Sequence, residues 1–182
     1  PAALNTGTRV EVRDLFYATP ARLKFMKSER AEQTAITDVV KRLAMAHPGV
    51  SFSLASGERV VMRAPAVMTG DSAGVLTRLG RMMGEDFMAD ARPVQAERHG
   101  ARVEGFAGLP TLNRANQMMQ FLFVNGRPVR DKLLAGAVRA AYGDLVPRGR
   151  FPMLALFLSV PPRDVDVNVH PAKAEVRFSD AG

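Results

Sequence analysis

The sequence contains no cysteine and no long apolar run, and these absences narrow its class. Without cysteine, the 182-residue chain can form neither disulfide bridges nor a metal site with thiolate ligands. No apolar stretch approaches the roughly 20 residues that cross a bilayer, and no signal-peptide pattern opens the chain. We therefore expect a cytoplasmic protein without a membrane partner, long enough to bury a core in one or two domains.

A glycine is also missing where a calcium loop would need one. Asp164, Asp166, Asn168 and Glu175 fall at positions 1, 3, 5 and 12 of the calcium-loop template. Position 6, which requires glycine for its sharp turn, is Val169. The sequence therefore argues against calcium, and we predict no metal site in this chain.

Positive charge is what the chain has in excess. Its net charge of +7 and pI near 10.5 favour polyanionic partners such as nucleic acid or nucleotide phosphates. Between residues 114 and 150 the cations outnumber the carboxylates Asp131 and Asp144. These cations are Arg114, Arg127, Arg130, Lys132, Arg139, Arg148 and Arg150. Such a cluster is usually a solvated face; the alternative is contact with phosphates, without readout of base sequence.

Helix signals occur at several places along the chain. Thr19-Pro20 and Ser28 have the residue types that begin helices. Helical spacing of apolar residues is found at Ile36, Val39, Val40 and Leu43, near residues 75–83, and, after the N-cap candidate Asp131, at Leu133, Leu134, Ala137, Val138 and Ala141.

Strand signals are interspersed with these helices. Alternating apolar residues predict strands at 8–12, 50–54, 59–63 and 121–124, and the continuous apolar run 153–160 suits a central strand buried on both faces. Two-residue turns are expected at His99-Gly100 and Asn125-Gly126. The mixed order, with hairpins, predicts an α+β fold. A segment rich in Pro, Gly, Asp and Ser between residues 64 and 74 predicts a domain junction.

The stretch from Asp164 to Phe178 is the most informative part of the chain. The valines at 165, 167 and 169 alternate with polar residues as in a strand, and Pro171 must end or bend that strand. Extended character resumes at Ala174, which predicts that Lys173 lies at the tip of a turn between two strands. Lys173 is then either a solvated turn residue or a point charge aimed at a phosphate on a neighbouring domain.

Three segments, taken in order, resemble the MutL/MLH/PMS family of DNA mismatch repair proteins. They are Gly7-Thr8 with L-F-Y-A-T-P-A-R-L-K-F at 15–25, F-V-N-G-R-P-V-R-D at 123–131, and D-V-N-V-H-P-A-K-A-E-V-R-F at 166–178. The resemblance implies the C-terminal part of a GHKL ATPase α/β sandwich at residues 1–65 and a linker at 66–74. It implies a transducer domain at 75–182, which is ribosomal-protein-like and similar to the second domain of gyrase B.

The resemblance also implies a nucleotide site. Thr8 matches a threonine near the adenine pocket, and Lys173 matches the transducer lysine that reaches the γ-phosphate of ATP. Asp166, Asn168 and His170 would support the turn that carries Lys173. The family's catalytic Glu and Gly-rich lid precede the Gly-Thr motif, so no catalytic residue is predicted here. We expect an ATPase that uses ATP and Mg²⁺ in the parent protein, with this chain alone inactive and without a bound cofactor.

For DNA, the resemblance points to Lys132, which matches a basic position that serves DNA binding in relatives. Together with Arg127, Arg130, Arg139 and Lys27, it forms the predicted DNA-contacting set, largely insensitive to sequence. The implied partners are the mismatch-recognition protein MutS, a downstream repair nuclease or helicase, and a second copy of the parent in an ATP-dependent dimer. The implied location is the bacterial nucleoid.

Two other functions are compatible with parts of the sequence. One is a stand-alone nucleic-acid-binding module of ribosomal-protein type, with no nucleotide role. The other is a different GHKL enzyme, such as a type II topoisomerase ATPase or a small-molecule kinase. The segment at 15–25 favours mismatch repair, because neither alternative requires it beside a transducer lysine.

Overall fold

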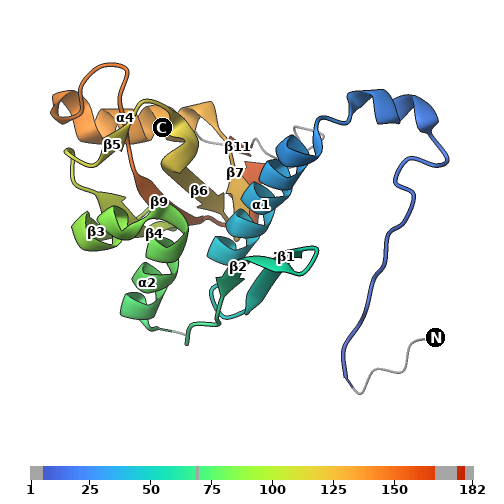
Figure 1. Cartoon of the computed structure of the whole chain (residues 1–182). Coiled ribbons are helices and arrows are strands. Elements are labelled where there is room, and N and C mark those ends of the chain that lie inside the picture. The colour runs from blue at the N-terminus through green and yellow to red at the C-terminus, as the bar shows by residue number, and fades with distance from the viewer. Residues whose placement is uncertain (1–5, 69, 167–175, 179–182) are drawn as a thin grey trace. The chain divides into compact units, whose positions relative to one another are not determined.

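The computed structural model describes residues 6–68, 70–166 and 176–178. The chain divides into two compact units, Pro1–Ile36 and Thr37–Gly182 (Figure 1). The helix α1, Glu29–Ala46, runs across this division. The assignment of 1–65 to an ATPase domain and 75–182 to a transducer, with a linker at 66–74, stays a prediction.

The N-terminal unit has helices at both predicted start signals. Thr19 is the N-cap of η1, Pro20–Phe25, with proline in its first turn, although this helix is of the tighter 3₁₀ type. The carbonyl of Ser28 accepts the first backbone hydrogen bonds of α1, from Ala31 and Glu32 at 2.8 and 3.0 Å. The Glu32 carboxylate accepts a hydrogen bond from the backbone N–H of Lys27 at 2.8 Å, which satisfies a donor at the helix start.

The predicted strand at residues 8–12 is wrong for this structure. These residues lie outside any helix or strand, and the side chains of Val10 and Val12 are 81% and 75% exposed. A strand needs a neighbour to complete its hydrogen bonds, and the described part of this unit contains no other strand.

The helix predicted around residues 36–43 is present, but its apolar residues are not the buried ones. Ile36, Val39 and Leu43 are exposed, whereas Ala44 and Met45 are buried. Spacing identifies a helix, but it does not establish which face meets a neighbour.

A mixed five-stranded sheet forms the centre of the second unit. Its strands, in spatial order, are β3 (Ala91–Arg98), β4 (Ala101–Gly108), β9 (Leu154–Ser159), β6 (Gln120–Val124) and β7 (Arg127–Val129). The middle strand β9 pairs antiparallel with β4 and parallel with β6, which confirms the central strand predicted from its apolar run. Both predicted two-residue turns are confirmed at β3–β4 and β6–β7, where all four turn residues have positive φ.

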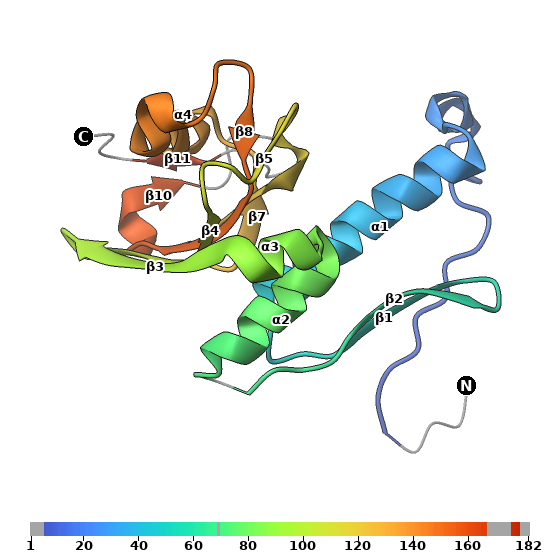
Figure 2. The same cartoon turned by 60° about the vertical axis from the view of Figure 1, so that its left-hand side comes forward.

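Helices cover both faces of this sheet, which confirms the α+β class (Figures 1 and 2). Along β6, Phe121 and Phe123 belong to one apolar cluster, while Leu122 and Val124 belong to the other. The first cluster includes the end of α1, α2 (Ser72–Met83) and α3 (Glu85–Asp90), and the second includes α4 (Lys132–Tyr142). Such alternation places successive side chains on opposite faces of a strand.

The start of α4 agrees with the sequence, but its buried stripe is narrower than expected. Asp131 caps the helix, because its carboxylate accepts a hydrogen bond from the Leu134 backbone N–H at 3.0 Å. Only Leu134 and Val138 of the predicted stripe are buried, and Leu133 is 48% exposed.

Three two-stranded sheets complete the description. They are β1–β2 (Phe52–Ser56 and Arg59–Ala64), β5–β8 (Asn113–Arg114 and Phe151–Pro152), and β10–β11 (Val165–Asp166 and Arg177–Phe178). Short 3₁₀ turns lie at η2 (Gln117–Met119), η3 (Gly143–Leu145) and η4 (Pro162–Asp164). The antiparallel pair β10–β11 agrees with the expected strands on either side of the Lys173 turn, but Asn168, His170 and Lys173 lie outside the described residues. Within the described ranges, no helix is both long and apolar enough to cross a membrane.

Candidate functional site

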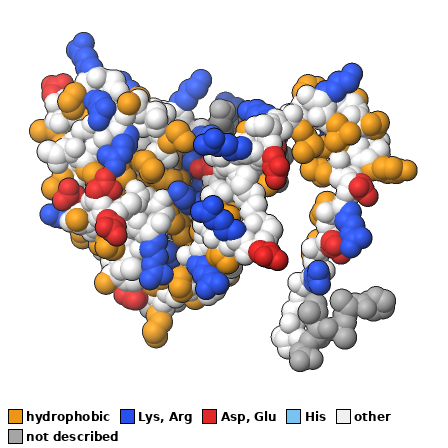
Figure 3. Space-filling view, in the orientation of Figure 1, with side chains coloured by type: hydrophobic (Ala, Val, Ile, Leu, Met, Phe, Trp, Pro, Cys, Tyr) orange, Lys and Arg blue, Asp and Glu red, His pale blue; other side chains and the backbone are white. Residues whose placement is uncertain are grey.

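A groove of about 690 Å³ gathers three of the predicted DNA contacts, namely Arg130, Lys132 and Arg139. Arg130 follows the edge strand β7, Lys132 opens α4, and Arg139 lies in the last turn of α4. Arg127 is exposed on β7 but does not line the groove, and Lys27 belongs to the N-terminal unit. On the face seen in Figure 3, Lys and Arg side chains are spread over the surface, so exposure alone does not delimit this site.

Lys132 and Arg139 lie on one side of α4. They are seven residues apart, which is about two helical turns and about 10 Å along the axis. Both are exposed, and neither has a carboxylate partner among the described residues. A nucleic-acid strand running along α4 could therefore place phosphates near both cations.

One carboxylate, Asp38 of α1, organises the other two arginines of the groove. It accepts hydrogen bonds from Arg42 Nε at 2.9 Å and from Arg130 Nη2 at 3.1 Å. Arg42 is buried and lies over the Phe121 ring at 4.8 Å, so its charge is already satisfied within the protein. The Arg130 side chain is 69% exposed, and an exposed ion pair contributes only about 0.2–1 kcal/mol. Arg130 can thus exchange this carboxylate for a phosphate at little cost.

Burial shifts the pKa of two residues near the groove, Lys41 and Tyr142. Burial lowers the pKa of Lys41, while the nearby Asp38 acts in the opposite direction. Burial raises the pKa of Tyr142, whose hydroxyl donates a hydrogen bond to the Gly108 carbonyl at 2.7 Å. Tyr142 is therefore a neutral structural donor that fastens the end of α4 to β4.

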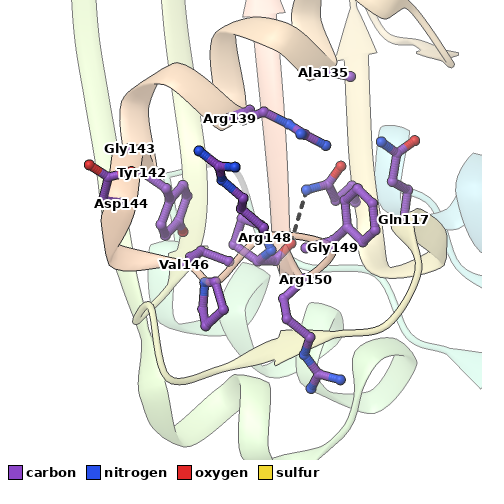
Figure 4. A pocket seen from close by; sticks show the side chains of 14 residues that line it. Gln117, Ala135, Arg139, Tyr142, Gly143, Asp144, Val146, Arg148, Gly149 and Arg150 are labelled. Atoms are coloured by element: carbon purple, nitrogen blue, oxygen red, sulfur yellow. Dashed lines mark hydrogen bonds between the residues drawn. The ribbon is translucent and has the colours of Figure 1, made fainter.

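A second hollow, of about 280 Å³, adjoins the groove (Figure 4). It shares Gln117, Gln120, Ala135 and Arg139 with the groove, so the two are continuous. Arg148 and Arg150 also line it. The sequence placed these two arginines in the basic cluster but not among the DNA contacts, although the glycine between them signals a turn that could project a side chain.

The buried Arg78 was not singled out by the sequence. It is 3% exposed, and its guanidinium donates hydrogen bonds to backbone carbonyls, including those of Ala44 and Val50, both at 2.9 Å. Its position in the sequence could have indicated burial, because Arg78 stands three residues after Val75 and one before Leu79, in the apolar face of α2. Its guanidinium is therefore hydrogen-bonded inside the fold, and Arg78 does not line the groove.

The described part of the structure does not bring the predicted nucleotide-binding residues together in one site. Thr8 is exposed and lines neither hollow. A third cavity, of about 380 Å³, belongs to the N-terminal unit and does not include Thr8. Lys173 lies outside the described residues, and Asp166 pairs with Arg177 across β10–β11. In the described part of the chain, no three His, Asp or Glu side chains gather as metal ligands.

Comparison with known proteins decides the family. Residues 79–182 match the family described as "DNA mismatch repair protein, C-terminal domain". The chain belongs to this DNA mismatch repair family. It is 63% and 62% identical, over all 182 residues, to the DNA mismatch repair proteins MutL of Nitrobacter winogradskyi and Rhodopseudomonas palustris strain BisB18. The chain spans 30% of the length of each of these relatives.

Solved structures of DNA repair proteins are similar to this chain, in agreement with its family. The Aquifex aeolicus MutL ATPase domain complexed with ADP is similar with a TM-score of 0.60 and 26% identity, covering 83% of this chain and 52% of that one. The N-terminal domain of a DNA repair protein gives a TM-score of 0.70 over 90% of this chain and 53% of that one; at 21% identity, it shows the fold alone. The resemblance to MutL and the GHKL-type architecture are thereby confirmed.

Proposed function

We propose that the whole protein is an ATP-dependent mismatch repair factor, and that this chain supplies the end of its ATPase domain and its transducer. ATP, with Mg²⁺, closes two copies of the protein around DNA. The closed form couples the mismatch-recognition protein MutS to a downstream nuclease or helicase. Membership of the mismatch repair family supports this function over a ribosomal-protein-like module. Its place of action is the cytoplasm, at the nucleoid.

The basic groove along α4 is the observation that carries the DNA-binding part of this proposal. Lys132 and Arg139 present charges that no described carboxylate neutralises, and Arg130 holds only an exposed ion pair. The described aromatic residues Phe121 and Phe123 are buried in the core, so they offer no stacking platform for bases. The groove therefore suits phosphate contact in any sequence context. Arg127 and Lys27 are proposed as further contacts outside the groove.

The nucleotide part of the proposal rests on the family and on the ADP complex of the Aquifex aeolicus relative. Thr8 contributes to the adenine side of the site, and Lys173 contacts the γ-phosphate. Asp166, Asn168 and His170 hold the Lys173 turn. Because hydrolysis removes the terminal phosphate, a lysine bound to it can report the nucleotide state to the transducer.

Charge reversal tests the DNA-binding proposal. In the whole protein with ATP, Lys132→Glu is expected to weaken binding to two duplexes of unrelated sequence by the same factor. Each phosphate contact contributes roughly −0.9 to the slope of log affinity against log salt, so the slope should flatten by about one unit. Arg98→Glu, an exposed residue of β3 that lines neither hollow, is the charge-matched control. Unchanged affinity and slope for Lys132→Glu would refute the groove as the DNA path.

Removal of the lysine charge tests the nucleotide proposal. Lys173→Ala is expected to reduce ATP-dependent dimerisation and turnover of the whole protein about tenfold or more, because a hydrogen bond to a charged group contributes about 1.5–3 kcal/mol. Dimerisation is measured by sedimentation and turnover by phosphate release, with Arg98→Ala as the control. Turnover within twofold of the parent would leave Lys173 as a surface residue.

A further inference from the structure

The Pro147–Arg150 segment forms a tight turn with Arg148 near its tip. The backbone N–H of Arg150 donates a hydrogen bond to the Pro147 carbonyl at 3.0 Å, which closes the turn. Gly149 has φ +76°, a conformation that glycine adopts without strain at the third position of a type II turn. Arg148 therefore occupies the second position, where its side chain is free to project. It is exposed and has no hydrogen bond or ion pair among the described residues.

The neighbouring Arg150 anchors this turn. Its Nε donates to Asn113 Oδ1 at 2.6 Å, and its Nη2 donates to the Asn113 carbonyl at 3.2 Å. Asn113 also pairs with Pro152 across β5 and β8, so the turn is attached to β5 at both points. In Figure 4 the Arg150 side chain points away from Arg139, whereas Arg148 lies on the same side of its turn as the helix that carries Arg139. Arg150 is thus a support, and Arg148 is available to a ligand.

Arg139 forms the facing wall of the hollow. Its guanidinium carbon lies 5.8 Å from the centroid of the Phe151 ring, which holds the side chain over the strand β8. Among the described residues, Asp144 is the one carboxylate that lines the hollow, and it is exposed and has no ion pair with a described cation. Two guanidinium groups that line one hollow place like charges around it, and an anion bound between them lowers their mutual repulsion. A phosphate satisfies both, because each guanidinium can donate two parallel hydrogen bonds to its oxygens.

We propose that Arg139 and Arg148 form a second phosphate subsite for a nucleic-acid backbone, continuing the groove that begins at Lys132. This inference rests on the proposed DNA-binding function and extends it by a site on a different element of the fold. Arg139 belongs to both hollows, so one strand passing from Lys132 to Arg148 meets it midway. The subsite reads backbone charge, and it adds affinity equally for all sequences.

Neutralising Arg148 tests the subsite in the whole protein with ATP and a fluorescent duplex. At 0.1 M salt, Arg148→Gln is expected to lower affinity about eightfold and to flatten the salt slope by about 0.9, the contribution of one phosphate contact. Arg148→Lys keeps the charge and should restore most of the slope. Arg98→Gln removes the same charge from β3, and thermal unfolding followed by circular dichroism verifies that each variant is folded.

The outcomes separate this inference from the proposal on which it rests. If Lys132→Glu weakens binding and Arg148→Gln does not, the subsite is refuted while the DNA-binding groove stands. If neither substitution has an effect, DNA binding by this groove fails as well. If Arg98→Gln weakens binding as much as Arg148→Gln, total charge explains the effect and the subsite is refuted. An additive loss in the Lys132→Glu, Arg148→Gln double variant supports two separate phosphate contacts.

Discussion

Arg78→Met is expected to destabilise the chain, because Arg78 joins three segments through backbone carbonyls. Its Nε bonds to Ala44 at the end of α1, its Nη2 to Val50 before β1, and its Nη1 to Pro65 after β2. The guanidinium also lies 5.7 Å from the centroid of the Phe52 ring. Burial lowers the pKa of Arg78, but a guanidinium stays charged at neutral pH because its ordinary pKa lies far above neutral. Positive charge at the C-terminal end of α1 also complements the helix dipole.

The magnitude follows from the carbonyls that lose their donor. A buried acceptor left unpaired costs about 1–3 kcal/mol, so loss of these three bonds, of which those to Val50 and Pro65 are part-buried, costs at most about 3–9 kcal/mol before any relaxation. Burial of the guanidinium itself costs several kcal/mol, and methionine removes that penalty while filling much of the same space. We therefore expect a net loss of about 3 kcal/mol in the free energy of unfolding.

Urea unfolding of the 182-residue chain, followed by circular dichroism, measures this loss. With the usual dependence on urea for a small protein, the midpoint should fall by about 1–3 M. Arg78→Lys should lose most of the same stability, because an ammonium has three donors and no planar fork to reach the separated carbonyls. Arg81→Met, on an exposed position of the same helix, is the matched control. A loss below about 1 kcal/mol for Arg78→Met would refute the idea that these hydrogen bonds join the segments.

Two further outcomes concern close packing and pH. Gly105→Ala is expected to lower the free energy of unfolding in urea by at least about 2 kcal/mol, because φ is +138° and a new Cβ would collide with the Ala155 carbonyl. Gly136→Ala in α4, where the space around the new Cβ is open, should instead raise the free energy of unfolding by about 0.5–1 kcal/mol. The hydrogen bond from Arg114 holds the pKa of Asp86 below its ordinary value, so its small stabilising contribution is present above about pH 4 and is lost as the pH falls through the lowered pKa. Both side chains are well exposed, so this contribution is below about 1 kcal/mol. Arg114→Ala should return the Asp86 pKa to its ordinary range in an NMR titration. An unchanged pKa would contradict Arg114 as the cause of the shift.

Local chemistry made much of the fold predictable. Asn125-Gly126 predicted its hairpin because both residues tolerate positive φ, and both adopt it. The apolar run at 153–160 predicted the central strand, because a strand with neighbours on both edges and cover on both faces favours apolar side chains at successive positions. The strand at 8–12 and the apolar face of α1 were misjudged, because each depends on a neighbour that local sequence does not specify.

The candidate site was predictable only in part. The sequence grouped Arg130, Lys132 and Arg139, and all three line the groove, while their contact with DNA stays a prediction. Lys132 and Arg139 have fixed relative positions because one helix, capped by Asp131, carries both. Arg42 was not anticipated in the groove, nor Asp38 as the partner of Arg130, because both come from α1, about 90 residues earlier in the chain. Arg148 joins the site through the pairing of β5 with β8, a contact that no local pattern announces. Long-range pairing thus decides which cations share a surface.

The net charge of +7 is consequently a poor measure of the surface that a nucleic acid meets. Arg78 contributes to that charge, but its donors are occupied by carbonyls inside the core, and Arg42 is held by Asp38 against Phe121. Lys132 and Arg148 contribute one charge each and have no described internal partner, so their full effect is available to phosphates. Affinity should therefore follow the number of unpartnered cations that line the groove and the hollow, and substitutions of equal charge at Arg98 and Arg148 should differ for that reason.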